Sequence, residues 1–380
     1  MNEDDSTQAL EDEATPSSVG RVRELERFAL ARLPSMQLAD GLFCQQVQVE
    51  NGCRPEGSSL RYTLIILIGL LRAEEHGIAQ PFHLGGLRAT VLSRLNSEEA
   101  APGDFGLALW AESRMEGSAL EELAGALAAR LERGRGLSPL MTMELAWMLM
   151  GLVEATARSG IGRGEELLEE IRTSLLDDRN PGSGLLTHTS RGPRRRFPHF
   201  ADQIYAALAL SQLARAREDA EALSACRAIA DRLVEAQMID GAWPWIYDPV
   251  RGTVVEPYEL YSVHQDSMAM IGLHGVSQAT GDPRYHLAAV SGLEWNYGNN
   301  VLGVEMVDRE RGLINRSIRR KQRLHRVQQA RNAASVYAKA RPKLPGPEGL
   351  EVNRTMRPYH LGWILEAWAG REELADIEHR

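Results

Sequence analysis

The chain has 380 residues, of which 43% are hydrophobic and 25% are charged, an ordinary balance for a globular protein that buries a core without disulfides or metals. Three cysteines exclude a disulfide framework and a four-cysteine zinc site, and the longest apolar run, Leu64 to Leu71, is far too short to span a membrane. The net charge is −9, but it is unevenly distributed along the chain.

The N-terminal segment is strongly acidic. Residues 1–20 contain six acidic residues and no basic residue, a pattern that argues against a secretory signal or a transit peptide. We expect residues 1–19 to form a disordered acidic tail on a cytoplasmic protein.

The rest of the chain has mainly helical periodicity, except that residues 41–49 alternate loosely and predict one arm of a β-hairpin. Twelve predicted helices alternate between two kinds. Segments apolar on most faces begin near residues 60, 104, 141, 201, 264 and 358. Amphipathic segments begin near residues 20, 84, 118, 162, 219 and 282. Six hairpins of this kind predict an all-α, closed (α/α)6 toroid over residues 20–377, with minor β-hairpin elements in the long loops; an open solenoid is the alternative.

The connections differ in length on the two ends of this predicted ring. Four of the six stretches that lead into apolar helices are long: 34–59, 178–200, 238–263 and 298–357. Long loops over a rigid scaffold commonly carry function. We therefore expect a site at the N-terminal ends of the inner helices, where the helix dipoles are positive.

Acidic residues recur at these helix starts. Asp266 is the first choice for a catalytic base or nucleophile, with Asp202 or Glu144 as the acid, because converging carboxylates have pKa values that differ. His264 and Tyr261 are expected to transfer a proton or to orient these groups. The structural alternative is that the aspartates cap their helices and that Glu144 pairs with an arginine such as Arg61.

Aromatic and basic residues supply candidate binding groups. Tyr and Trp side chains gather between residues 243 and 297, and arginines gather in the loop 184–199. Tyr and Trp stack on sugar rings or stabilise cations, and arginine clamps carboxylates or phosphates. The predicted substrate-binding residues are Arg61, Tyr62, His188, Arg194, Arg196, Trp243, Trp245, Tyr247 and His360. No nucleotide motif and no metal-ligand spacing is present, so neither a cofactor nor a metal is expected.

Residues 311–347 contain eleven basic residues and no acidic one, so that the other residues carry a charge of −20. A helix is predicted over 317–340, inserted before the last inner helix and acting as a lid for an anionic substrate. A solvated surface helix is the alternative. An anionic membrane surface is a second candidate partner, and nucleic acid is disfavoured because only Tyr337 interrupts the basic run.

Three short runs resemble known toroids. Gln237 to Trp243, QMIDGAW, resembles the QxxxGxW repeat of terpenoid cyclases. Gln237 to Ala269 resembles the glucuronyl hydrolases and glucuronyl C5-epimerases, and Tyr261 to Asp266 resembles bacterial toroid proteins associated with polysaccharide assembly. The DxDD acid motif of class II terpenoid cyclases is missing. The resemblance supports the toroid fold.

These observations favour a carbohydrate-active enzyme, hydrolase or epimerase-like, acting on an anionic or lipid-linked saccharide. One alternative is a non-standard terpenoid cyclase in which Asp266 protonates an alkene and aromatic rings shield the cation. Another is a binding or scaffold toroid without catalysis.

Overall fold

The computed structural model describes residues 17–97, 100–134, 136–321 and 346–376. Among these residues, the inner helices are α2 (Leu60–Glu75), α4 (Pro102–Arg114), α6 (Thr142–Arg158), α8 (Phe200–Arg217), α10 (Ala269–Thr280) and α13 (Tyr359–Trp368). The outer helices are α1 (Ser18–Arg32), α3 (Leu84–Leu95), α5 (Leu120–Arg133), α7 (Gly162–Asp177), α9 (Ala220–Ala236) and α11 (Arg284–Ser291). The two kinds alternate along the chain as predicted.

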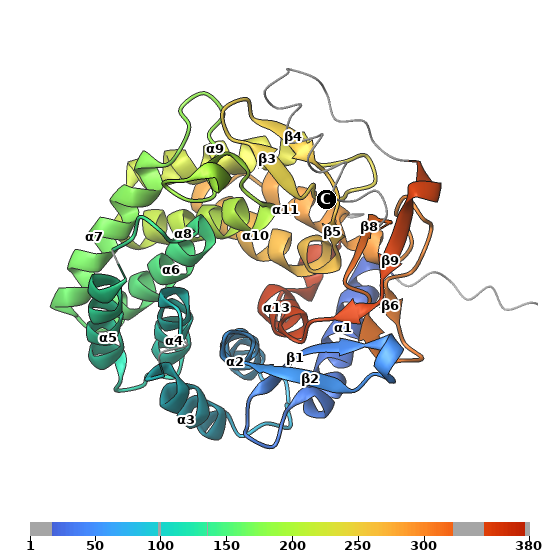
Figure 1. The fold of residues 1–380 in the computed structure, drawn as a ribbon, viewed down its shortest axis with the longest axis horizontal. Helices are drawn as coiled ribbons and strands as arrows, with labels where there is room; N and C mark the ends of the chain where they lie inside the picture. Colours follow the sequence, from blue (N-terminus) through green and yellow to red (C-terminus); the bar gives the residue numbers. More distant parts are fainter. Residues whose placement is uncertain (1–16, 98–99, 135, 322–345, 377–380) are drawn as a thin grey trace, which may run out of the picture.

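The inner helices form a closed ring. Each one contacts the next in the sequence, and α13 contacts α2, which joins the last hairpin to the first (Figure 1). The predicted (α/α)6 toroid is therefore confirmed, and the open solenoid is wrong. None of the helices in the described residues is both long enough and apolar enough to span a membrane.

Burial separates the inner helices from the outer ones. In α2 every residue from Thr63 to Leu71 is buried, whereas α5 buries one stripe that includes Leu123 and Leu127. A helix that is apolar all round is stable only when neighbours cover every face, and an amphipathic helix needs only one neighbour. The hydrophobic pattern thus determines which helix of each hairpin lies inside.

Glycines allow the inner helices to approach closely. A Cβ atom on Gly69 of α2 would lie 2.1 Å from the Gly362 carbonyl oxygen of α13, and one on Gly151 of α6 would lie 2.1 Å from the Gly106 carbonyl oxygen of α4. Both contacts are between backbones, so no side-chain rotation relieves them. These glycines set the diameter of the ring at two of its helix pairs.

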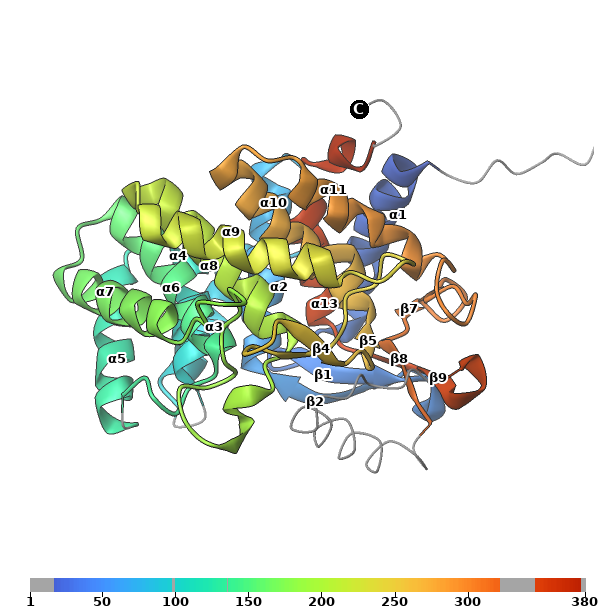
Figure 2. The same cartoon turned by 90° about the horizontal axis from the view of Figure 1, so that it is seen from above.

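Short sheets collect at one end of the ring (Figure 2). The predicted hairpin arm is β1 (Phe43–Gln48), which pairs with β2 (Pro55–Ser59) and with β10 (Thr355–Met356). A second three-stranded sheet has the order β5 (Leu260–Tyr261), β8 (Ser317–Arg320) and β9 (Leu350–Asn353). The two-stranded sheets are β3 (Ile246–Asp248) with β4 (Thr253–Glu256) and β6 (Val307–Asp308) with β7 (Leu313–Ile314).

Three predicted helices differ from the structure. The inner helix expected from residue 264 begins with one π-helical turn, His264–Met268, and the outer helix expected over 282–297 is helical in two shorter pieces, α11 and Leu293–Asn296. The helix expected from Ser317 does not begin there, because Ser317–Arg320 pair in register with Leu350–Asn353 as strand β8. Residues 322–345, and the tail 1–16, lie outside the described residues.

Candidate active site

The N-terminal ends of the inner helices are connected by polar contacts around the ring. The Asp202 carboxylate of α8 accepts a hydrogen bond from the Met143 N–H of α6 at 3.2 Å. Glu144 of α6 pairs with Arg61 of α2 at 3.4 Å, and Tyr62 lies against Tyr359 of α13 with ring centroids 4.6 Å apart. The predicted residues from four inner helices therefore share one end of the ring.

The acids at this end act as helix caps. The side chains of Asp104 and Asp202 accept hydrogen bonds from the backbone N–H three residues earlier, at 2.8 Å in both helices. Arg61 then bridges Asp104 at 2.7 Å and Glu144 at 3.4 Å, with its guanidinium over the Trp147 ring. The structural alternative holds here, because each carboxylate has a cap or ion-pair partner that keeps it in place.

Asp266 is enclosed completely. Its side chain has no exposed surface, and its oxygens accept hydrogen bonds from His360 at 2.7 Å and from Asn296 at 2.7 Å. The Trp368 indole N–H donates to its backbone carbonyl. This carboxylate joins the π-helical turn to α13 and has no access to a substrate, so the geometry favours a structural role over the expected role as base or nucleophile. His360 shares that role.

Two histidines flank Asp202. His188 Nδ1 lies 2.7 Å from Asp202 Oδ2, and its Nε2 makes no hydrogen bond to a described residue. The His188 and His199 rings lie 4.8 Å apart, and His199 remains partly exposed. One carboxylate thus orients His188 through its side chain and His199 through its backbone.

The pKa values of the two imidazoles are shifted in opposite directions. Burial lowers the pKa of His188, but the hydrogen bond and the negative charge of Asp202 outweigh burial and raise this pKa above the ordinary 6.5. Burial lowers the pKa of His199 below 6.5, because there the charge of Asp202 only partly compensates for it. The two neighbouring imidazoles therefore differ in basicity, with His188 the one that holds a proton to higher pH.

An aromatic surface adjoins the histidines. His199 stacks on Trp245 with ring centroids 5.3 Å apart and planes inclined by 24°, and Tyr261 lies between Trp245 and His264. Burial lowers the pKa of His264 to about 3, so this ring is neutral at physiological pH. Trp245 and Tyr261 are partly exposed and can meet a ligand.

Two of the predicted aromatic contacts belong to the core instead. Trp243 and Tyr247 are fully buried, and the backbone N–H of Trp243 donates to the side-chain oxygen of Gln265. Of the three aromatic residues Trp243, Trp245 and Tyr247, only Trp245 is partly exposed, and it stacks on His199.

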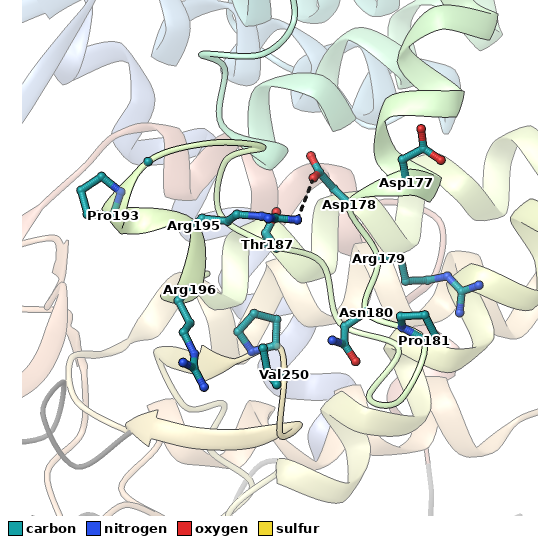
Figure 3. Close-up of a pocket in the computed structure, with 12 residues that line it drawn as sticks. Asp177, Asp178, Arg179, Asn180, Pro181, Thr187, Pro193, Arg195, Arg196 and Val250 are labelled. Carbon is teal, nitrogen blue, oxygen red and sulfur yellow. Dashed lines mark ion pairs between the residues drawn. The ribbon is translucent and has the colours of Figure 1, made fainter. Parts of the chain in front are cut away.

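The loop 184–199, called the site loop below, also carries the predicted Arg194 and Arg196. Arg196 pairs with Asp248 at 3.5 Å and lines a pocket of about 530 Å³ that includes Arg195 and Asp178 but none of the aromatic or histidine residues above (Figure 3). In Figure 3 the Arg195 side chain crosses to Asp178, at 3.8 Å. Arg194 is exposed and close enough to His188 to lower its pKa. Arg196 therefore lies outside the group around the histidines.

His188, His199 and Asp202 also have the residue types of a metal site, with ligand atoms within 4.8 Å of one another. The Asp202 carboxylate, however, already accepts from the His188 ring and from two backbone N–H groups. A cation would have to displace these donors, so the set does not fit a metal as it stands, and we derive no metal chemistry from it.

Two residues here were not among the predicted site residues. His199 shares the loop 184–199 with His188, where it was considered only as part of an anion clamp, and its position three residues before Asp202 is that of a helix N-cap. Arg316 was counted only as part of the basic run. Its backbone joins β8, and its guanidinium lies over the Tyr261 ring, 5.2 Å from the centroid. Only the tertiary structure brings it to the site.

Solved structures similar to this chain include a sugar epimerase, an unsaturated glucuronyl hydrolase and a cellobiose 2-epimerase. The chain is similar to a sugar epimerase from a ruminal bacterium, with a TM-score of 0.61 and 12% identity over 93% of this chain and 98% of that one. It is similar to a mutant of the unsaturated glucuronyl hydrolase from Streptococcus agalactiae, with a TM-score of 0.62 and 13% identity over 92% of this chain and 91% of that one. The chain is also similar to a cellobiose 2-epimerase from Spirochaeta thermophila, with a TM-score of 0.58 and 12% identity over 93% of this chain and 97% of that one.

The chain is a six-hairpin toroid. At these identities the likeness establishes the fold and leaves the activity to the chemistry of the site. No protein-family model matches the sequence. A search of curated proteins finds no match.

Proposed function

We propose that this toroid is a carbohydrate-active enzyme of the epimerase or isomerase type, which moves a proton on an anionic saccharide. The observation that carries the proposal is the His188 and His199 pair, whose pKa values lie on opposite sides of 6.5 while their rings lie 4.8 Å apart. General acid–base catalysis needs this combination of a protonated donor and an unprotonated acceptor within reach of one substrate.

The geometry fits enolisation of an open-chain sugar. His199 removes a proton from the carbon next to the carbonyl group, and the electron pair of that C–H bond forms the carbon–carbon double bond of an enediol. His188 donates its proton to the carbonyl oxygen. Transfer of the proton from His199 to the former carbonyl carbon, with loss of the neighbouring hydroxyl proton to His188, gives an isomerised sugar. Return of the proton to the original carbon on the opposite face of the enediol, with loss of the proton that His188 donated, gives an epimerised sugar, and both routes restore the two histidines.

The aromatic surface supports a sugar substrate. The faces of Trp245 and Tyr261 are apolar and partly exposed, and sugar rings and chains present C–H groups that pack on such faces. The anionic character of the substrate remains part of the proposal and is taken further below.

Hydrolysis is the competing chemistry, with His188 protonating a leaving oxygen and His199 activating water. Isotopes separate the two. We expect reducing sugars incubated with the protein in deuterated water to gain carbon-bound deuterium, detected by mass spectrometry and NMR. Incorporation of ¹⁸O from labelled water into a cleaved glycoside, without deuterium on carbon, would instead establish a hydrolase.

Variants assign the residues. H199Q is expected to reduce deuterium incorporation at least 100-fold, and H188Q by a comparable factor, since general acid–base groups contribute about 10² to 10⁴ in rate. H76Q is the matched control, because His76 is exposed at the C-terminal end of α2, the opposite end of the ring. If no sugar exchanges with the wild-type protein, the scaffold alternative gains support.

The terpenoid cyclase has little support in this geometry. Its acid would be Asp266, whose oxygens are occupied by His360 and Asn296 and have no exposed surface. None of the structures named above is a terpenoid cyclase.

A further inference from the structure

One cation at the candidate site lacks a counter-ion. The Arg316 side chain is half-buried, its Nε is buried without a hydrogen-bond partner, and it makes no ion pair with a described residue. Arg61, at the same end of the ring, is matched by Asp104 and Glu144. Burying a charge without a partner is costly, so Arg316 is expected to have one when the protein works.

The nearest acid does not serve as that partner. Glu259 accepts hydrogen bonds from the Tyr261 hydroxyl at 3.1 Å, from the Ser317 hydroxyl and from the Asn353 amide at 3.1 Å. These donors hold the carboxylate in the sheet formed by β5, β8 and β9. Burial lowers the pKa of Arg316, but Tyr261, Tyr359 and Glu259 together outweigh burial and raise it, although Glu259 forms no ion pair with Arg316.

The backbone of Arg316 is fixed on both sides. Its N–H donates to the Asn353 carbonyl at 2.9 Å, and its carbonyl accepts from the Ser262 N–H at 2.9 Å. A guanidinium on an anchored backbone and over the face of Tyr261 is held in position before any ligand arrives, which reduces the entropy lost on binding.

Tyrosines surround this guanidinium. Tyr62, Tyr261 and Tyr359 are all close enough to interact with it electrostatically, and Tyr261 also contacts His264. The hydroxyls of Tyr62 and Tyr359 make no hydrogen bond to a described residue. The surroundings therefore combine one positive charge with two neutral donors, which suits an anion with several oxygen atoms.

We propose that Arg316 is the specificity-determining residue that receives the carboxylate or phosphate group of the saccharide, with the Tyr62 and Tyr359 hydroxyls as additional donors. This inference rests on the proposed function for the identity of the substrate as a sugar. It adds the residue that selects an anionic sugar over a neutral one.

Binding measurements test the proposal directly. The probes are glucuronate, glucose 6-phosphate and glucose, titrated by NMR or calorimetry; the first two distinguish carboxylate from phosphate. The wild-type protein is expected to bind at least one anionic probe 10-fold or more tightly than glucose. R316Q is expected to lose that preference while its affinity for glucose changes less than 2-fold, and R316K to retain part of it.

The matched control is R191Q, which removes the same charge from an exposed position on the site loop that makes no ion pair with a described residue. It is expected to leave all three affinities unchanged. Equal effects of R191Q and R316Q would reduce the result to net charge and would overturn the proposal.

Stability gives a second readout. A receptor arginine without a counter-ion is expected to destabilise the free protein, so R316M should unfold at the same temperature as the wild type or higher. A purely structural arginine would give a lower midpoint in R316M and an unchanged preference in R316Q, and either of these two results would overturn the proposal.

The outcome is separable from that of the proposed function. Anionic preference that disappears in R316Q, without deuterium exchange on any sugar, would support the receptor and contradict the proton-transfer activity. Exchange on anionic sugars that is unaffected in R316Q would contradict the receptor and support the activity. Failure of the wild-type protein to prefer either anionic probe would also overturn the receptor.

Discussion

Asp202 controls two histidines through different bonds, one to the His188 ring and one to the His199 backbone. Because the hydrogen bond and the charge of Asp202 outweigh burial and raise the pKa of His188, the effect of this carboxylate on the proposed catalysis should be visible in the pH profile. At the scale of single residues, the proposed catalysis depends on this coupling of Asp202 to the two histidines rather than on the number of acids at this end of the ring.

The proposed activity should have a bell-shaped pH profile. Below the pKa of His199 the base becomes protonated, and above the pKa of His188 the acid loses its proton, so activity is expected to fall on both sides of pH 6.5. D202N should shift the alkaline limb to lower pH and leave the acid limb less affected. Initial rates of deuterium incorporation from pH 4 to 10 measure both limbs, and an alkaline limb that D202N leaves in place would contradict the assignment of His188.

A second residue-scale prediction concerns stability. Burial and the neighbouring Glu372 raise the pKa of Glu26 from 4.5 to about 8. Between these values the folded protein holds a proton that the unfolded chain has released, so this group's contribution to stability is present at low pH and is lost as the pH rises to 8.

E26Q keeps the shape of this side chain but removes the charge. We expect E26Q to raise the free energy of unfolding at pH 8.5 by about 1–2 kcal/mol, less than the full shift implies because solvent screens part of the interaction, and to change it little at pH 5. Urea denaturation at both pH values provides the measurement. An equal effect at the two values would show that the charge of Glu26 is not responsible.

At the scale of helices, the close backbone contact between α4 and α6 can be tested by substituting a glycine. G151A places a Cβ against the Gly106 carbonyl between α4 and α6 and is expected to lower the free energy of unfolding by about 1–3 kcal/mol. G125A is the control, because Gly125 lies exposed in α5 with no atom within 4 Å of the added Cβ, and should raise stability by up to about 1 kcal/mol. Denaturant midpoints compare the two, and a stable G151A would mean that the pair can separate at little cost.

The QxxxGxW run also has an element-scale explanation. The Gln237 amide donates to the Gly241 carbonyl at 2.8 Å and to the Ala288 carbonyl of α11 at 2.9 Å, while Gly241 has a φ of +81°. The motif thus ties the end of one outer helix to the next and turns the chain toward Trp243. The motif therefore has a structural explanation in the packing of neighbouring hairpins.

Closure determines the behaviour of the whole molecule. Because α13 packs on α2, no hairpin is terminal, and unfolding is expected to be a single cooperative transition. G362A, which places a Cβ 2.7 Å from the Ile66 Cα, should lower hydrogen-exchange protection in α6 and α8 as much as in α2 and α13. Loss of protection confined to α2 and α13 would show that the hairpins unfold separately, as in an open solenoid.

The sequence by itself determined the class and order of the helices, because burial on all faces or on one stripe is written in the periodicity of residues such as Leu64 to Leu71. It also predicted, through the long loops and through Glu144, Asp202 and Tyr62, that the candidate site lies at the N-terminal ends of the inner helices. The first β-hairpin arm followed from the alternation over 41–49.

Only the tertiary structure decided which of these residues are enclosed by partners from distant parts of the chain. Asp266 and Asp202 occupy equivalent places at helix starts, yet His360 and Asn296 enclose the first, while the second lies beside His188. Arg316 and the strand that follows it are basic and helix-compatible in sequence, but pairing with Leu350–Asn353 makes that run a strand. Local patterns fix periodicity and charge, whereas partners distant in the chain fix exposure and pairing, and the chemistry of a site depends on both of these.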